Sequence, residues 1–276
     1  MSPEKKEGLY VYGFFEGGKL PSLIGKGVDL CHEVVSLPYR QISAALSIVS
    51  LEEYGETPLA ARLQDLHWIT PRIQIHKTVI ESIMEVSPVI PLRFCTIFTR
   101  EERIIGILKA NYRRFQVFFG AVRDKEEWGV KVYADPRQVT STVGRISPLI
   151  RDFDEIIPLA SPGEAYLLRK KRELLVQEAL ADFLDPFAEE IYQMLAPYTA
   201  GGRRNRLLDR RATGKGEEMI LNAAFLIRKE EMNDFKKRLE KIAIAYESQG
   251  LIFELSGPWP PYNFCPVFEG SGRSAE

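Results

Sequence analysis

The amino-acid sequence predicts an α+β protein with two domains, and three observations lead to this class. The chain has 276 residues, which favours two domains, because a domain usually contains roughly 100 to 200 residues. Apolar residues make up 45% and charged residues 27% of the chain, a balance typical of folded proteins with real cores. Short strand-like runs and apolar stripes of helical period alternate along the sequence, so both kinds of element are expected in each domain.

The first domain is predicted to span residues 1–123 and to contain a mixed sheet with helices. Residues 8–15 are rich in aromatic and β-branched side chains and are followed by Gly17-Gly18, which indicates a strand that ends in a turn. Short segments with little charge are expected to form the other strands of this domain. These segments are residues 32–37, 44–51 and 89–94.

The helices of the first domain are predicted from caps and apolar spacing. Thr57-Pro58 and Thr70-Pro71 each combine a cap with a first-turn proline, which indicates helices from about 58 to 67 and from about 71 to 86. Thr99 is the predicted cap of a third helix, whose apolar positions continue to Phe119. One buried face is expected on the second helix, formed by Ile73, His76, Ile80 and Ile83.

The second domain is predicted to span residues 124–268 and to begin with a strand at 128–133. Ser161 and Glu164 have the spacing of a capping box at the start of a long helix. Its apolar period continues through Pro186, so we expect one helix with a kink there. The alternative is two helices, the second capped by Asp185.

The remaining elements complete a split βαβ arrangement. Residues 219–227 indicate a strand, 232–246 a helix and 251–256 a final strand, and a weaker strand is expected at 205–212. The resulting order of strand, helix, strand, strand, helix, strand predicts a sheet with two helices on one face. Residues 134–160 are expected to be a connector, and 269–276 a flexible tail.

Composition and motifs argue against several classes of function. Lysine and arginine (37) nearly balance aspartate and glutamate (38), which disfavours a strongly basic nucleic-acid-binding protein. The sequence has neither a long apolar segment for crossing a membrane nor a secretory signal, so we expect a cytoplasmic protein. Three widely spaced cysteines and three histidines show no spacing typical of zinc sites, and no nucleophile or phosphate-loop motif is complete. We therefore predict no catalytic residue, cofactor or metal site.

The segment Gly257–Phe264 combines three prolines with Trp259, Tyr262 and Phe264. Large aromatic side chains on a chain stiffened by proline can bind a partner at low entropic cost. These three residues are therefore the predicted partner-binding residues. The alternative is that the segment covers an edge of its own sheet.

Several segments, taken in order, resemble the family of gas vesicle proteins F and L. Cys95 is a departure, because the family more usually has glycine at that position. Arg93 and Trp128 are expected to have structural roles. The matching segments are residues 8–13, 65–69 with His76, 91–98, 127–132, 161–167 and 257–264.

This resemblance implies a non-enzymatic accessory or minor structural protein of gas vesicles, acting in nucleation and assembly. Its implied partners are the hydrophobic shell protein A and other gas vesicle accessory proteins, with no nucleic acid and no membrane. The resemblance also implies two α+β domains, the C-terminal one ferredoxin-like, and a location at the gas vesicle and in the cytoplasm. The competing hypothesis is an RNA-binding protein built from ferredoxin-like domains, because such folds can bind RNA and the sequence contains two basic clusters. These clusters are Arg169–Arg172 and Arg203–Lys215.

Overall fold

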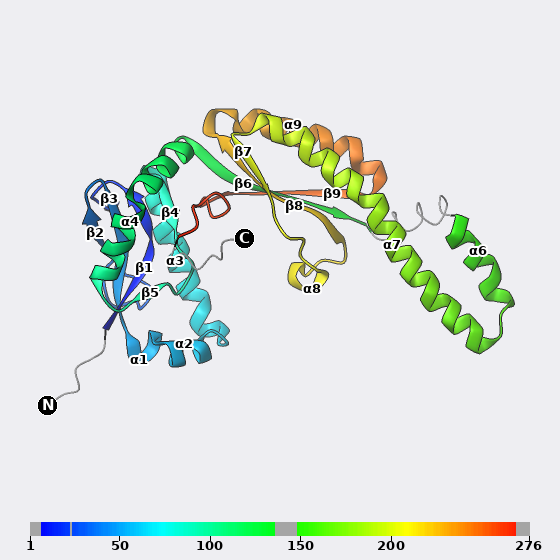
Figure 1. Cartoon of the computed structure of the whole chain (residues 1–276), viewed down its shortest axis with the longest axis horizontal. Coiled ribbons are helices and arrows are strands. Elements are labelled where there is room, and N and C mark those ends of the chain that lie inside the picture. Colours follow the sequence, from blue (N-terminus) through cyan, green and yellow to red (C-terminus); the bar gives the residue numbers. More distant parts are fainter. Residues whose placement is uncertain (1–6, 23, 136–147, 269–276) are drawn as a thin grey trace. The chain divides into compact units, whose positions relative to one another are not determined.

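The structure is a computed structural model that describes residues 7–22, 24–135 and 148–268. It has the α+β class expected from the sequence, with two antiparallel sheets and helices packed on them (Figure 1). The chain divides into two compact units: unit 1 contains the residues up to Lys125 and those from Pro260 onward, and unit 2 contains Glu126–Trp259. The segment 260–268, which the sequence assigned to the second domain, thus groups with unit 1.

The sheet of unit 1 is built around its first strand, β1. Strand β3 lies on one side of β1 and β4 on the other, with β2 outside β3 and β5 also pairing with β1. Every pairing given for these strands is antiparallel, so the expectation of a mixed sheet was wrong. The reason is that β3 and β4, which run in the same direction, are separated by β1. The strands are β1 (Glu7–Glu16), β2 (Val35–Tyr39), β3 (Ile42–Ser50), β4 (Val89–Pro91) and β5 (Ile97–Phe98).

The helices of unit 1 are α1 (Leu51–Tyr54), α2 (Glu56–Arg62), α3 (Leu66–Val86) and α4 (Glu101–Val122). Helix α3 begins four residues before its predicted cap Thr70, because the carboxylate of Asp65 accepts hydrogen bonds from the backbone of His67 (2.9 Å) and Trp68. Pro71 therefore lies inside the helix. Helix α4 begins after Arg100 and not after the predicted cap Thr99.

The core of unit 1 fills both faces of its sheet, which explains why β1 is buried almost throughout. On one face Tyr10 and Tyr12 pack with Ile80 and Ile83 of α3. On the other face Phe14 stacks on Phe115 of α4, with 5.4 Å between ring centroids. A strand covered on both sides is expected to be rich in apolar and aromatic residues, as residues 8–15 are.

Unit 2 contains a sheet in the order β7-β8-β6-β9, with α7 and α9 packed on one face (Figure 1). The pairings β6 with β9 and β7 with β8 are antiparallel. The strands are β6 (Lys125–Ala134), β7 (Gly201–Arg204), β8 (Glu218–Arg228) and β9 (Leu251–Trp259). The helices are α6 (Pro148–Ile156), η1 (Ile157–Leu159), α7 (Pro162–Leu195), η2 (Ala196–Tyr198), α8 (Arg210–Thr213), η3 (Lys229–Glu231), α9 (Met232–Tyr246) and η4 (Glu247–Gln249).

Two predictions for this unit were wrong. The expected connector 134–160 contains α6 and η1, although residues 136–147 lie outside the described part of the chain. The weak strand expected at 205–212 is replaced by β7 at 201–204 and by α8. Strand β7 has little strand propensity of its own, and its pairing with β8 defines it.

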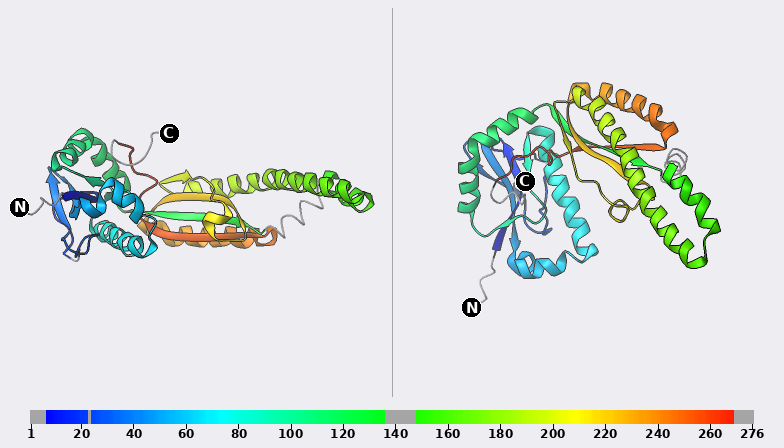
Figure 2. Two further views of the ribbon diagram at one scale, coloured as in Figure 1. Left: turned by 90° about the horizontal axis from the view of Figure 1, so that it is seen from below. Right: turned by 45° about the vertical axis from the view of Figure 1, so that its right-hand side comes forward.

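Helix α7 is one continuous helix of 34 residues that includes Pro186, which decides against the two-helix alternative. The kink expected at Pro186 stays a prediction. The capping box is present: the Glu164 carboxylate accepts from both the Ser161 N–H (3.2 Å) and its hydroxyl (2.7 Å). At 1.5 Å per residue α7 is about 50 Å long, whereas the 11 residues of β8 span about 36 Å. The first half of α7 therefore extends past the sheet, and α6 folds back against this half of α7 (Figure 2).

Candidate interaction surfaces

The structure does not gather the three predicted partner-binding residues into one described surface. Trp259 is the last residue of β9 in unit 2, is 39% exposed and donates from Nε1 to the Ser256 hydroxyl at 3.1 Å. Tyr262 and Phe264 are half-buried and belong to unit 1, where Tyr262 packs against the core. Backbone hydrogen bonds from both residues to Pro260 and Pro261 shape this segment as tight turns.

The two residues expected to be structural differ in burial. Trp128 is buried in the core of unit 2, donates to Glu126 at 3.1 Å and lies beneath the Lys236 ammonium at 4.8 Å. Arg93 is exposed, so it does not require a buried acidic partner. Cys95 has a φ of 64°, in the left-handed region that favours glycine. The cysteine at this position thus has a backbone conformation that is usual for glycine.

The titratable groups inside unit 1 form hydrogen bonds that hold the core together. The Tyr10 hydroxyl accepts from the Cys95 N–H at 3.0 Å and lies 2.8 Å from His76 Nδ1. Burial lowers the pKa of His76 to about 4, and burial raises the pKa of the Cys95 thiol to about 12. At neutral pH His76 is therefore uncharged and Cys95 is a thiol, which is a poor nucleophile.

Within residues 7–22, 24–135 and 148–268, no three His, Cys, Asp or Glu side chains are grouped to hold a metal ion. Over the same ranges, no helix combines the length and the apolar character needed to cross a membrane.

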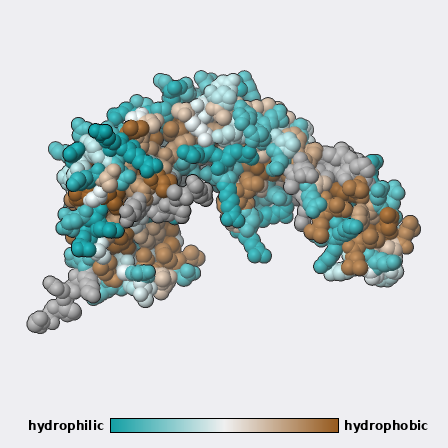
Figure 3. All heavy atoms as spheres, viewed as in Figure 1, coloured by the Kyte–Doolittle hydropathy of each residue, from teal (hydrophilic) through white to brown (hydrophobic). Residues whose placement is uncertain are grey.

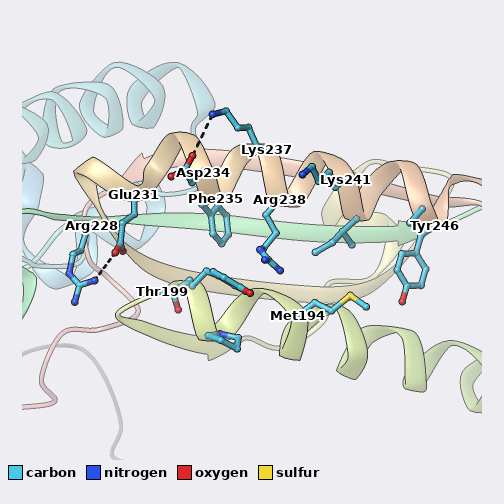
Figure 4. A pocket seen from close by; sticks show the side chains of 14 residues that line it. Met194, Thr199, Arg228, Glu231, Asp234, Phe235, Lys237, Arg238, Lys241 and Tyr246 are labelled. Carbon is cyan, nitrogen blue, oxygen red and sulfur yellow. Dashed lines mark hydrogen bonds and ion pairs between the residues drawn. The ribbon is translucent and has the colours of Figure 1, made fainter.

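A groove of about 710 Å³ lies between the end of α7 and α9 in unit 2 (Figure 4). Arg228 pairs with Glu231 at 2.8 Å, Lys237 pairs with Asp234 at 3.4 Å, and the Arg238 guanidinium lies 3.4 Å from the centre of the Tyr198 ring. Both cations and carboxylates therefore surround its apolar floor. The floor is formed by Met194, Pro197, Tyr198, Phe235, Ile242, Ala245 and Tyr246.

An apolar surface on α2 and α3 was not predicted as a site. We call it the α2–α3 face and define it by Leu59, Leu63, Leu66, Ile69 and Ile73. Leu66 is 75% exposed and Ile73 is 44% exposed, so Ile73 does not belong to the buried face expected from the sequence. Ile69 and Ile73 lie three and seven residues after Leu66, so the three side chains share one side of α3. Hydrophobic side chains gather over this part of unit 1 in Figure 3.

The α2–α3 face carries little free charge. Between Thr57 and Ile73 the only charged residues are Arg62, Asp65 and Arg72. The Arg72 guanidinium is tied down: it pairs with Glu53 at 3.0 Å, donates to the Tyr54 hydroxyl at 2.9 Å and stacks over Trp68 at 4.3 Å. The face is thus apolar and carries few charges, and the polar contacts of Arg72 attach it to the rest of unit 1.

A second apolar surface lies where α7 extends past the sheet. We call residues 149–174 the arm; it comprises α6, η1 and the first part of α7. Ile150 and Ala165 are buried in it, and Arg172 binds Asp154 through two hydrogen bonds of 2.7 and 3.0 Å. Hydrophobic side chains gather on this hairpin in Figure 3. Its exposed apolar residues are Leu149, Ile156, Leu159, Tyr166, Leu167 and Leu174.

Both surfaces could have been found from the sequence by following each apolar stripe to its end. The stripe of α3 begins at Leu66, well before the buried Ile80, and α7 continues past the length that its sheet can cover. Leu149, Phe153 and Ile156 have helical spacing in the segment taken as a connector. Aromatic residues beside prolines drew the prediction to 257–264 instead.

Comparison with known proteins gives a consistent result. The family model described as gas vesicle synthesis protein GvpL/GvpF matches residues 8–266. Gas vesicle protein L of a Streptomyces species is 26% identical over 233 residues, which cover 84% of this chain and 83% of that protein. Gas vesicle protein F of Haloferax mediterranei is 21% identical over 270 residues and 97% of each chain.

Solved structures match the fold. The crystal structure of gas vesicle protein GvpF from Anabaena has a TM-score of 0.72 at 18% identity, covering 95% of this chain and 100% of that one. The crystal structure of GvpF from Microcystis aeruginosa has a TM-score of 0.69, also at 18% identity, covering 94% of this chain and 99% of that one.

Proposed function

The chain belongs to the GvpL/GvpF family of gas vesicle synthesis proteins, and we propose that it acts in the nucleation and assembly of gas vesicles as an accessory or minor structural protein. In this proposal it binds the hydrophobic shell protein A and limits its aggregation, at the vesicle and in the cytoplasm. Other gas vesicle accessory proteins are proposed as further partners. The nucleic-acid alternative finds no support in the relatives above, all of which are named gas vesicle proteins.

The physical need for such a protein follows from the chemistry of a gas-filled shell. A subunit that forms a water-excluding wall must expose apolar surface before incorporation, and such surface aggregates in water unless it is covered. A cover for that surface should itself be apolar, nearly free of charge and rigid, because burying an unpaired charge costs free energy.

The α2–α3 face is the observation that carries this proposal. It combines the exposed side chains of Leu63, Leu66 and Ile73 with few charges, and the network around Arg72 fixes it to the unit beneath. Trp259, Tyr262 and Phe264 are proposed as additional contacts, Trp259 first because it is the most exposed of the three.

We also propose that unit 2 has a ferredoxin-like topology. Its elements follow the order β6, α7, β7, β8, α9, β9, with short helices between them, and its strands lie in the order β7-β8-β6-β9. Both features support a split βαβ sandwich with two helices on one face.

The test is a sedimentation assay with purified shell protein A. Shell protein is diluted from denaturant into buffer with the full chain, and the soluble fraction is measured after centrifugation. The wild-type chain is expected to keep shell protein soluble, and Leu66→Asp with Ile73→Asp is expected to weaken this binding by tenfold or more, since each buried aliphatic side chain contributes roughly 1.5–3 kcal/mol.

The matched control is Val117→Asp on α4 of the same unit, because Val117 is 74% exposed and Leu66 is 75% exposed. This variant is expected to behave like the wild-type chain. Shell protein that precipitates equally with and without the wild-type chain would contradict the function. Equal loss in the Val117 variant would contradict the assignment to the α2–α3 face.

A further inference from the structure

The arm carries apolar and charged side chains in a repeated arrangement on its two helices. On α6, Leu149 and Ile156 are seven residues apart, and the exposed Asp152 lies three residues after the first. On α7, Leu167 and Leu174 are also seven residues apart, and the exposed Lys170 and Lys171 lie between them. Residues three, four and seven apart lie on one side of a helix. Each apolar pair therefore has charged side chains between its two members on the same side of the helix.

The enclosed charges have opposite sign on the two helices. Within the described ranges Asp152 takes part in no ion pair, and Lys170 and Lys171 contact the Tyr166 and Phe153 rings at 5.5 and 6.0 Å. The salt bridge within the arm uses a different pair, Arg172 with Asp154. The acidic side of α6 and the basic side of α7 are therefore both available to another molecule.

We propose that the arm binds the arm of a second copy of this chain, with α6 of each copy against α7 of the other. This arrangement places Asp152 of one copy near Lys170 and Lys171 of its partner and covers the exposed leucines of both. A two-fold interface has the same patch on both copies, so the patch must be complementary to itself. The arm meets this condition because the charge beside the exposed apolar pair is Asp152 on α6 but Lys170 and Lys171 on α7. The alternative two-fold arrangement, α6 against α6 and α7 against α7, would bring like charges together.

The size of the arm sets the expected strength. Thirteen residues of α7 from Pro162 to Leu174 span about 20 Å, and two helices side by side are about 20 Å wide. The face of each copy is thus roughly 400 Å², or about 800 Å² for the two copies together, which is below the range of standard specific interfaces and typical of weak, transient ones. We therefore expect a dimer with a dissociation constant in the micromolar range. This inference concerns the purified chain alone and does not depend on the proposed function.

The experiment measures the mass of the full-length chain by light scattering and by sedimentation velocity, from about 1 to about 200 µM to bracket a micromolar equilibrium. The wild-type chain is expected to pass from monomer to dimer across this range. Leu167→Ser with Leu174→Ser is expected to weaken the dimer by roughly tenfold or more per leucine. Ile244→Ser on α9 is the matched control, because Ile244 and Leu167 are both 66% exposed, and it is expected to leave the dimer unchanged.

Charge reversal tests the pairing of the two helices. Lys170→Glu with Lys171→Glu is expected to leave a monomer, because it places carboxylates opposite Asp152 of the partner copy. Adding Asp152→Lys to that variant is expected to restore the dimer. Circular dichroism checks that every variant keeps its helix content, so that loss of the dimer reports on the interface.

A wild-type chain that stays monomeric over the whole range would overturn the inference, as would failure of the second charge reversal to restore a dimer. Binding of shell protein A to the arm would appear as a monomeric wild-type chain whose sedimentation assay is impaired by the leucine substitutions. That result would overturn self-association while leaving the proposed function intact.

Discussion

The α2–α3 face and the arm are both exposed, helical and apolar, but charge is distributed differently on them. The α2–α3 face has few charged residues, and Arg72 is held beneath it. The arm has four consecutive cations, Arg169–Arg172, on α7 and three carboxylates on α6. Apolar exposure alone therefore indicates only that a surface can bind a partner. The charged residues around the surface indicate which charges that partner must carry.

The two surfaces also share an origin. In each, a helix begins with exposed apolar side chains and becomes buried farther along: on α3 from Leu66 to Ile80, and on α7 from Leu167 to Ile191. The buried end of each helix stabilises the fold and the exposed end does not. Substitutions at the two ends should therefore change the free energy of unfolding by different amounts.

The largest effect is expected from truncating the covered end of α3. Ile80→Ala removes a fully buried side chain from the core of unit 1 and should lower the free energy of unfolding by about 2–5 kcal/mol. Leu66→Ala on the same helix should change it by about 0.5 kcal/mol or less. Urea unfolding monitored by tryptophan fluorescence measures both; equal losses would mean that Leu66 is covered within the chain itself.

A smaller effect is expected from the arginine that underlies each surface. Arg72→Met removes the cation that pairs with Glu53 in a partly buried site and leaves that carboxylate only its hydrogen bond from the Trp68 indole, so it should cost about 2–3 kcal/mol. Arg172→Met removes a half-exposed pair with Asp154 and should cost about 1 kcal/mol or less. Thermal unfolding of the two variants side by side checks this order. A larger loss for Arg172 would show that the arm, and not the base of the α2–α3 face, is the more rigid support.

A still smaller effect concerns pH and the covered end of α3. The pKa of His76 is about 4 in the folded chain and 6.5 in its ordinary state, so below pH 6.5 the unfolded chain binds the proton more readily. Stability is thus fully present above pH 6.5 and declines as the pH falls toward 4, by about 2 kcal/mol between pH 7 and pH 5.

The matched variant is His76→Gln, which keeps a hydrogen-bonding group for the Tyr10 hydroxyl but does not titrate. Its unfolding free energy, measured by urea at pH 7 and pH 5, should fall by about 2 kcal/mol less than that of the wild-type chain. Identical pH dependence in the two chains would show that His76 already carries its proton in the folded state at pH 5.

The sequence predicted the helices and strands better than it predicted which of their side chains are buried. Period and capping indicated α3, α7 and α9, and the Ser161–Glu164 capping box was confirmed. The start of α3 was misplaced because Asp65 and Thr70 are both good caps and the choice depends on whether Leu66 joins the helix. The exposure of Ile73 was missed because periodicity shows which side of a helix is apolar, not how far the rest of the unit covers it.

The candidate site was predicted less well, for a related reason. Trp259, Tyr262 and Phe264 attract attention as single residues, but Tyr262 packs against the core of unit 1 and Trp259 lies in the other unit. Leu66, Leu167 and Leu174 are ordinary residues in a helix and become notable only when the structure shows that nothing in the described chain covers them. Helix α6 was missed although its nine residues include Leu149, Phe153 and Ile156 at helical spacing.

The most direct test of the account is amide hydrogen exchange of the full chain with and without shell protein A. The first amides of α3 lack helical partners within the helix, and α2 is short, so exchange in residues 56–73 responds readily to contact. Slower exchange at 56–73 is expected when shell protein is added, with exchange in α4 unchanged. Unaltered exchange at 56–73, or protection confined to α4, would contradict it.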